Sequence, residues 1–204
     1  MGLTGVLAAM LYAAAGSFGA PATPDEMADA QAWAATVGQV INASYDGQPL
    51  AESLAGWKKK DKEAAPKDGV STRTLRFTDP KTRLEVNCTV RQFDGFPAVE
   101  WLVTLRNKGK RDTPLLEGIH PLDWRIPWAE DGATIHYSPG DSNDAKSFAP
   151  MTQALSSGST EPFVLAPKGG RSSEDYMPFF NIESKGRGVT MAVGWSGQWE
   201  TSFG

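Results

Sequence analysis

Serines, histidines and carboxylates are the side chains of this sequence that could carry covalent or acid–base chemistry. Ser196 lies in the segment GWSGQW (194–199), but no G-x-S-x-G pattern of a nucleophile elbow occurs and no histidine is near Ser196 in sequence. His120 and His136 each stand alone, which favours structural roles. Hydrolysis of a glycosidic bond needs two carboxylates across a pocket, whereas Asp and Glu fall mainly in expected loops and on polar strand faces. We therefore expect no catalytic residue in this chain.

Cys88 is the single cysteine, which excludes an internal disulfide. It alternates with Leu84, Val86 and Val90, so we interpret it as a small buried hydrophobe and not as a reactive thiol. No Cys/His cluster has the spacing of metal ligands. The segment PKGGRSS (167–173) is neither G-x-G-x-x-G nor a Walker sequence. The sequence predicts no metal and no cofactor.

The chain has 7 tryptophans in 204 residues, and aromatic faces beside carboxylates or amides are what a sugar-binding surface requires. Trp101 is in phase with apolar residues of its expected strand and is predicted to be core. Trp195 shares a strand phase with Val193 and is expected in the core or close to it. Trp199 and Phe203 are expected to be half-buried in a segment that leaves the sheet. For the set as a whole, packing is favoured over stacking on a sugar.

The composition is that of an ordinary soluble globular protein, with 40% hydrophobic residues and a net charge of −4. A chain of this length can bury a core without metal or disulfide support. Because the sequence shows no Lys/Arg stripe, a nucleic-acid partner is not expected. The basic run WKKKDKE (57–63) is interrupted by acids, and we interpret it as a solvated helix face.

Residues 1–22 are predicted to be a signal peptide. The segment 3–20 is apolar and uncharged, and Ala20 and Ala22 fit the small-x-small rule for cleavage, although no Lys or Arg precedes the apolar run. A membrane anchor is the alternative, but the segment is short and contains glycines. We expect an exported bacterial protein, periplasmic or secreted, with no membrane association after cleavage.

The expected elements begin with a helical segment at 23–37, because Thr23, Pro24 and two acidic residues form a helix start. A strand that ends at an Asp-Gly turn is expected within 39–50. A short helix at 51–60 and a polar loop at 60–71 should follow.

From residue 71 the hydrophobic period becomes two, as in half-buried antiparallel strands. The longest segment without a strand pattern is 138–160. The sequence therefore predicts a mainly β fold, an antiparallel β-sandwich over residues 38–204 with one or two short N-terminal helices.

Four ordered blocks of the sequence resemble one family. They are SYDGQPLAESLAGWK (44–58) and the segments 96–123, 136–150 and 169–203. Together they look like the N-terminal β-supersandwich domain of α-galactosidases of the melibiase group, glycoside hydrolase family 36 and close relatives in clan D. The resemblance covers about residues 38–203 and implies an antiparallel β-supersandwich.

In that family the supersandwich precedes a (β/α)₈ barrel, which carries two catalytic aspartates that act as nucleophile and acid/base in a retaining mechanism. No segment of this sequence matches the barrel motifs. The resemblance therefore implies no catalytic residue here, and the barrel expected to follow is absent from these 204 residues.

The resemblance also implies a rim of the substrate pocket, since a loop of the family's sandwich reaches toward the active-site face of the barrel, sometimes that of a neighbouring subunit. The matching segments are GDSNDAKSF (140–148) and GGRSS (169–173). Packing of both loops on the barrel without sugar contact is the alternative. The implied substrate-binding residues are Asp141, Asn143, Asp144, Phe148, Arg171 and Trp199, with Ser172 and Ser173 as neighbours.

The sequence thus predicts a non-catalytic N-terminal domain of an exported α-galactosidase-like glycoside hydrolase. It would support the catalytic barrel, shape the galactoside pocket rim or mediate homo-oligomerisation. Its partners would be the barrel and, through the complete enzyme, α-galactosides or other oligosaccharides. Two alternatives remain open, a free-standing carbohydrate-binding β-sandwich and a structural envelope protein whose sandwich makes protein contacts.

Overall fold

The computed structural model describes residues 8–12, 21–36, 41–141, 143–156 and 160–204. It is mainly β, with 46% of residues in strands and 12% helical, and its strands pair in antiparallel fashion. This confirms the predicted mainly β, antiparallel class with one or two short helices, and the structure has two. The chain forms two compact units: Ala22–Trp124 makes up most of unit 1, and Arg125–Gly204 with Ala9–Pro21 makes up unit 2.

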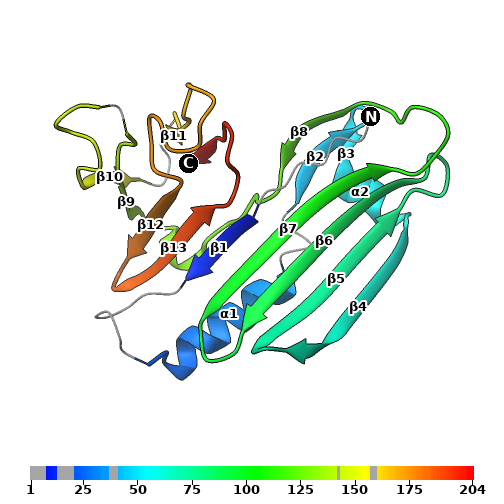
Figure 1. Cartoon of the computed structure of the whole chain (residues 1–204), viewed down its shortest axis with the longest axis horizontal. Helices are drawn as coiled ribbons and strands as arrows, with labels where there is room; N and C mark the ends of the chain where they lie inside the picture. The colour runs from blue at the N-terminus through cyan, green and yellow to red at the C-terminus, as the bar shows by residue number, and fades with distance from the viewer. Residues whose placement is uncertain (1–7, 13–20, 37–40, 142, 157–159) are drawn as a thin grey trace. The chain divides into compact units, whose positions relative to one another are not determined.

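The main sheet of unit 1 has four consecutive strands joined by tight turns (Figure 1). The first turn places Asp68 and Gly69 at φ of 51° and 75°, the left-handed conformation that two-residue hairpin turns require. The strands are β4 (Lys58–Lys67), β5 (Val70–Thr78), β6 (Leu84–Phe93) and β7 (Ala98–Asn107).

Strand β4 corrects two predictions, the solvated helix face at 57–63 and the polar loop at 60–71. The segment pairs with β5 from Lys58 opposite Thr78 to Ala64 opposite Thr72, and all of its residues are exposed. Strand β4 is an edge strand whose backbone N–H and C=O groups form hydrogen bonds with β5 on one side. Because of this pairing, the strand can form although none of its side chains is buried. Its sequence therefore lacks the alternation that marks a strand.

Alternate residues of β6 and β7 form the core of unit 1. Trp101 is 1% exposed, and its Nε1 donates to the carbonyl oxygen of Pro121 at 3.2 Å. Cys88 is fully buried, and this burial raises the pKa of its thiol to about 12. The predictions of a core tryptophan and a buried structural cysteine are both confirmed.

Helix α1 (Pro24–Thr36) begins as predicted. The Thr23 backbone N–H donates to Glu26 Oε2 at 2.7 Å, and the Glu26 N–H donates to Thr23 Oγ1 at 3.3 Å, which is a capping box. The helix buries Ala30 and Ala34 and packs against β6 and β7.

A second, three-stranded sheet of unit 1 has the order β3-β2-β8. Its strands are β2 (Asn42–Tyr45), β3 (Gln48–Pro49) and β8 (Leu116–His120), and the short helix α2 (Leu50–Ala55) follows β3. The expected strand does end at the Asp-Gly turn, whereas the expected helix at 51–60 stops before Gly56 and Lys58 already begins β4.

Unit 2 contains a sheet in the order β10-β9-β12-β13-β1 and a separate pair, β11 with β14 (Figure 1). A short 3-10 helix, η2 (Pro127–Ala129), precedes β9. Strand β10 lies inside the segment 138–160, where no strand was expected. The strands are β9 (Ala133–Tyr137), β10 (Met151–Leu155), β11 (Phe163–Leu165), β12 (Phe179–Ser184), β13 (Arg187–Val193) and β14 (Thr201–Phe203).

Strand β1 (Ala8–Tyr12) falls within the predicted signal peptide, most of which lies outside the described residues. It pairs with β13, from Ala9 opposite Val193 to Tyr12 opposite Thr190. Cleavage near residue 22 stays a prediction. No helix in the described part of the chain is long and apolar enough to cross a membrane.

Candidate functional site

Two loops of unit 2 run side by side, loop A (138–141 and 143–149, between β9 and β10) and loop B (168–178, between β11 and β12). The Gly140 N–H donates to the Asp175 carbonyl oxygen at 3.0 Å, and the Asp141 N–H donates to the Ser173 carbonyl oxygen at 2.9 Å. At the base of the loops the Met177 N–H donates to the Ser138 carbonyl oxygen at 3.0 Å. These are the two segments to which the family resemblance assigned the pocket rim.

Glycine at position 140 makes this approach possible. A Cβ atom there would lie 2.0 Å from the Ser173 carbonyl oxygen and 2.6 Å from that of Glu174. Both atoms belong to the backbone of loop B, which cannot rotate away as a flexible side chain could. Any larger residue would therefore push the loops apart.

The C-terminal segment fixes loop B from a third direction. The Ser172 N–H donates to the Ser196 carbonyl oxygen at 3.2 Å. Trp199 Nε1 donates to the Ser172 carbonyl oxygen at 2.7 Å, and the Trp199 side chain is only 5% exposed. Trp199 therefore lies at the predicted rim as a buried support for loop B.

The burial of Trp199 differs from expectation. Trp199 is buried although a half-buried position was predicted, and Trp195 is half-buried. Strand β13 ends at Val193, so Trp195 no longer follows its alternation. A Cβ at Gly197 would lie 2.7 Å from Trp195 Nε1, so the backbone passes close to that ring before Trp199 turns inward.

Arg171 is exposed in loop B and forms an ion pair with Glu174, with 3.3 Å between Nη2 and Oε1. The hydrogen bond to Glu174 raises the pKa of Arg171, and the negative charges of Glu174 and Asp141 add to this effect. Two predicted rim residues, Asp141 and Arg171, thus lie on the two joined loops, and the ion-pair partner of Arg171 is Glu174.

Glu174 and Asp175 are loop B residues that the sequence did not single out. The Glu174 carboxylate lies where a Cβ at Gly169 would be, with Oε2 only 1.5 Å from that position. Asp175 Oδ2 accepts from the Lys168 N–H at 2.5 Å. The sequence signal that could have identified these residues is the pair of glycines at 169 and 170, which is followed by two acidic residues. Glycine leaves room for the backbone of loop B to fold back against an acidic side chain of the same loop.

The remaining rim candidates make their hydrogen bonds within loop A. The Lys146 N–H donates to Asp144 Oδ1 at 2.5 Å, and the Phe148 N–H donates to the Pro139 carbonyl oxygen at 3.3 Å. Asn143 and Phe148 have φ of 58° and 63°, a conformation that is uncommon for residues other than glycine. Phe148 is 55% exposed, so its ring faces solvent on a tightly folded loop.

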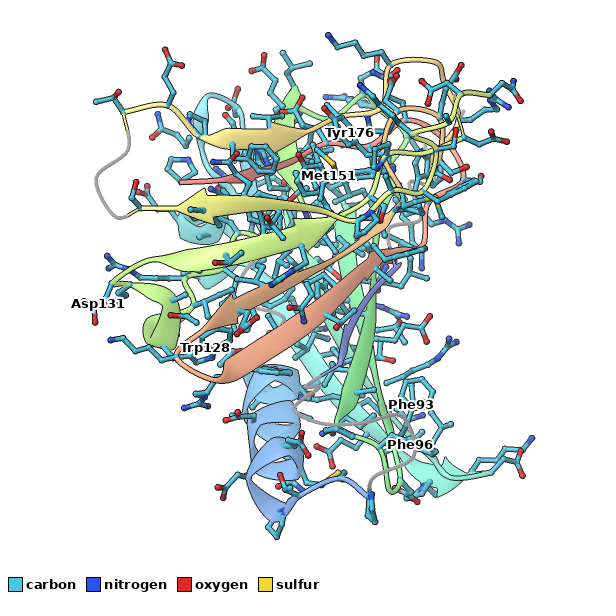
Figure 2. The ribbon with its side chains drawn as sticks, turned by 90° about the vertical axis from the view of Figure 1, so that its left-hand side faces the viewer. Phe93, Phe96, Trp128, Asp131, Met151 and Tyr176 are labelled. Carbon is cyan, nitrogen blue, oxygen red and sulfur yellow. The ribbon has the colours of Figure 1, made fainter. Side chains whose placement is uncertain are left out.

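An aromatic cluster anchors the base of the loops. Tyr176 in loop B and Tyr137 at the end of β9 have ring centroids 6.1 Å apart, and Tyr137 lies 5.3 Å from Phe163 of β11. Phe203 of β14 continues the cluster, with its ring 5.2 Å from that of Phe180. Figure 2 labels Tyr176. The cluster joins the loops to both sheets of unit 2.

The joined loops present a guanidinium, several carboxylates and an exposed phenyl ring. The carboxylates can accept hydrogen bonds from sugar hydroxyls and the guanidinium can donate to them. The phenyl ring can lie against the C–H face of a sugar. Within the described ranges, no group of three His, Cys, Asp or Glu side chains could hold a metal ion. The arrangement suits recognition of a polar ligand.

Unit 1 has a hollow of its own, of about 350 Å³, between α1 and the edge of the main sheet. Gln31 and Ala34 line it from α1, and Glu63, Thr72 and Arg73 line it from the sheet. Arg73 is held by Asp61, with 2.7 Å between Nη2 and Oδ2, so its charge is already neutralised.

Comparison with models of known protein families gives no match. Comparison with curated proteins also gives none.

Proposed function

We propose that this chain is the non-catalytic β-domain of an α-galactosidase-like glycoside hydrolase. In that enzyme it supports the catalytic barrel, and loops A and B shape one rim of the galactoside pocket. The observation that carries the proposal is the backbone ladder between these loops, because the resemblance assigned the rim to two segments far apart in sequence. Export and homo-oligomerisation belong to the same proposal and rest on the sequence alone.

The joined loops supply a rigid and polar rim. Trp199 and Gly140 hold loop B against its neighbours, so Asp141 and Arg171 project from a fixed backbone. A carboxylate accepts and a guanidinium donates hydrogen bonds to the hydroxyls of a galactoside. Groups that act on substrate binding alone change KM and leave kcat unchanged.

The test uses the product of the complete gene, including any coding sequence beyond the codon for Gly204. Asp141→Asn and Arg171→Ala should each raise KM for an aryl α-galactoside by roughly tenfold with kcat unchanged, since a hydrogen bond to a charged group contributes about 1.5–3 kcal/mol. Lys146→Ala removes an exposed cation of loop A and is the matched control. Unchanged KM in both rim variants would contradict the rim assignment.

A free-standing carbohydrate-binding module is the second candidate. Phe148 and Phe179 favour it, because they are 55% and 48% exposed and could stack on sugars. Calorimetry of the 204-residue chain with galacto-oligosaccharides separates the two. The module predicts binding that is lost on Phe148→Ala, whereas the rim domain predicts no measurable binding by the chain alone.

A further inference from the structure

One face of the main sheet of unit 1 gathers cations that are scattered in the sequence. Residues directly opposite each other on neighbouring strands share a face, and the register places Lys60 opposite Arg76, Arg76 opposite Asn87 and Asn87 opposite Thr104. Three parallel rows complete this surface, which we call the cationic face. They are Lys58-Thr78-Glu85-Arg106, Lys62-Thr74-Thr89-Leu102 and Ala64-Thr72-Arg91-Glu100.

The cationic face carries six cations and two carboxylates, a net charge of +4 in a chain whose net charge is −4. Glu100 pairs with Arg91 at 3.2 Å, and Glu85 pairs at 3.0 Å with Lys108, just beyond β7. Arg76 donates to the neutral Asn87 side chain at 2.7 Å. In the described part of the chain, the other four cations form no ion pair: Lys58, Lys60, Lys62 and Arg106.

This arrangement opposes folding in the absence of a partner. Lys60 lies directly opposite Arg76, and like charges in that position are destabilising. The three lysines of β4 that share this face lie about 7 Å apart, two residues along the strand. Lysines on an edge strand also prevent pairing with other chains. That role does not account for Arg76, Arg91 and Arg106, which lie on β5, β6 and β7.

The remaining side chains define the chemistry of the partner. Threonine hydroxyls and the Asn87 amide fill the rows between the cations, and Leu102 and Ala64 are the face's only apolar members. No residue of these four rows is aromatic, and Phe93, opposite Val70 in the adjoining row, supplies a single ring at one end of the face. A single ring is not a stacking platform for successive bases of a single-stranded nucleic acid. The apolar side chains of the face, Leu102 and Ala64, are also too few to insert into a membrane interface. A ligand that carries both carboxylates and hydroxyls would form ion pairs with the cations and hydrogen bonds with the threonine and asparagine side chains.

We propose that the cationic face binds an acidic polysaccharide whose uronate carboxylates pair with Lys58, Lys60, Lys62 and Arg106. The threonine and asparagine side chains between the cations donate hydrogen bonds to the sugar hydroxyls and accept hydrogen bonds from them. This site lies in unit 1, whereas loops A and B lie in unit 2. The inference is therefore independent of the proposed role at a galactoside pocket.

The test is binding of the complete chain to polygalacturonate, measured by calorimetry at about 50 mM and 200 mM salt. The variant Lys58→Gln/Lys60→Gln/Lys62→Gln should bind polygalacturonate at least about tenfold more weakly than the wild type. The slope of the logarithm of its association constant against the logarithm of the salt concentration should be smaller in magnitude by about two. The variant Arg125→Gln/Lys185→Gln/Arg187→Gln changes the net charge equally in unit 2, outside loops A and B, and should bind as the wild type does. A finer pair is Lys60→Gln, which should weaken binding, and Lys59→Gln on the opposite face of β4, which should not.

The proposal is overturned if the wild-type chain does not bind polygalacturonate at the lower salt concentration. Equal affinity of the β4 triple variant and the wild type would also overturn it, as would an equal loss in the unit 2 control. Neutral dextran should not bind. Tighter binding to single-stranded DNA or to phosphatidylserine vesicles than to polygalacturonate would reject the assignment of a polysaccharide.

Discussion

Replacing Trp199 with phenylalanine tests whether this residue holds loop B in place. The change removes the Nε1 donor that lies 2.7 Å from the Ser172 carbonyl oxygen, and it leaves a void because the side chain is only 5% exposed. The hydrogen bond contributes about 1 kcal/mol, and the lost ring atoms add a comparable amount. We expect Trp199→Phe to lower the free energy of unfolding of unit 2 by about 2 kcal/mol.

Urea denaturation followed by circular dichroism measures this loss, and hydrogen exchange reports on the loop directly. The Ser172 amide, which donates to Ser196 at 3.2 Å, should exchange faster in the variant. Trp195→Phe is the matched control, because Trp195 is half-buried in the same segment and should lose less than about 1 kcal/mol. A Trp199→Phe variant as stable as the wild type, or a control that loses as much, would refute the reasoning.

Three further predictions concern the packing of each unit. Tyr45→Phe removes the phenol that donates to Asp79 Oδ2 at 2.8 Å and should cost unit 1 about 2 kcal/mol at pH 7 in urea denaturation. Burial alone would raise the pKa of Asp79, but hydrogen bonds from Thr82, the Lys81 amide and Tyr45 together lower it. The ionised carboxylate therefore stabilises the folded state at pH values above the pKa that Asp79 has in the unfolded chain. The loss of stability caused by Tyr45→Phe should become smaller as the pH falls through the pKa of Asp79 in the folded state. Cys88, with a thiol pKa raised to about 12 by burial, should resist alkylation at pH 8 in the native state and react fully in urea; rapid native labelling would contradict its burial. Gly140→Ala should destabilise unit 2 by about 2 kcal/mol because its Cβ meets the Ser173 carbonyl oxygen. Gly56→Ala in unit 1, whose Cβ would lie 3.7 Å from its nearest neighbour, should leave the stability of unit 1 unchanged. A Gly140→Ala variant whose unit 2 is as stable as that of the wild type would exclude the close approach of the loops.

The strands with one apolar face were predictable from the sequence, and the edge strand was not. Val86, Cys88 and Trp101 alternate with polar residues, and the structure buries all three. Strand β4 has no such alternation, since all of its residues are exposed. Its strand conformation depends on the ladder to β5, a tertiary contact that local pattern does not encode. The cationic face was missed for the same reason, because it requires the register of four strands.

The convergence of loops A and B likewise depends on contacts between distant segments. The resemblance picked out Asp141 and Arg171, but nothing local indicated that the Asp141 amide would bond the Ser173 carbonyl oxygen. The burial of Trp199 was misjudged because its segment was expected to leave the sheet, whereas Trp199 packs inward and its Nε1 donates to the Ser172 carbonyl oxygen. Beyond a strand end, the backbone path and not the sequence period decides which side chain turns inward.

The central claim is that this chain serves a galactosidase without carrying its catalytic groups. The most direct measurement is the turnover of an aryl α-galactoside by the product of the complete gene and, in parallel, by the 204-residue chain alone. We expect hydrolysis by the complete product and none by the 204-residue chain. This expectation would be contradicted if neither hydrolysed the substrate, or if the 204-residue chain did so and lost that activity on substitution of one of its own carboxylates.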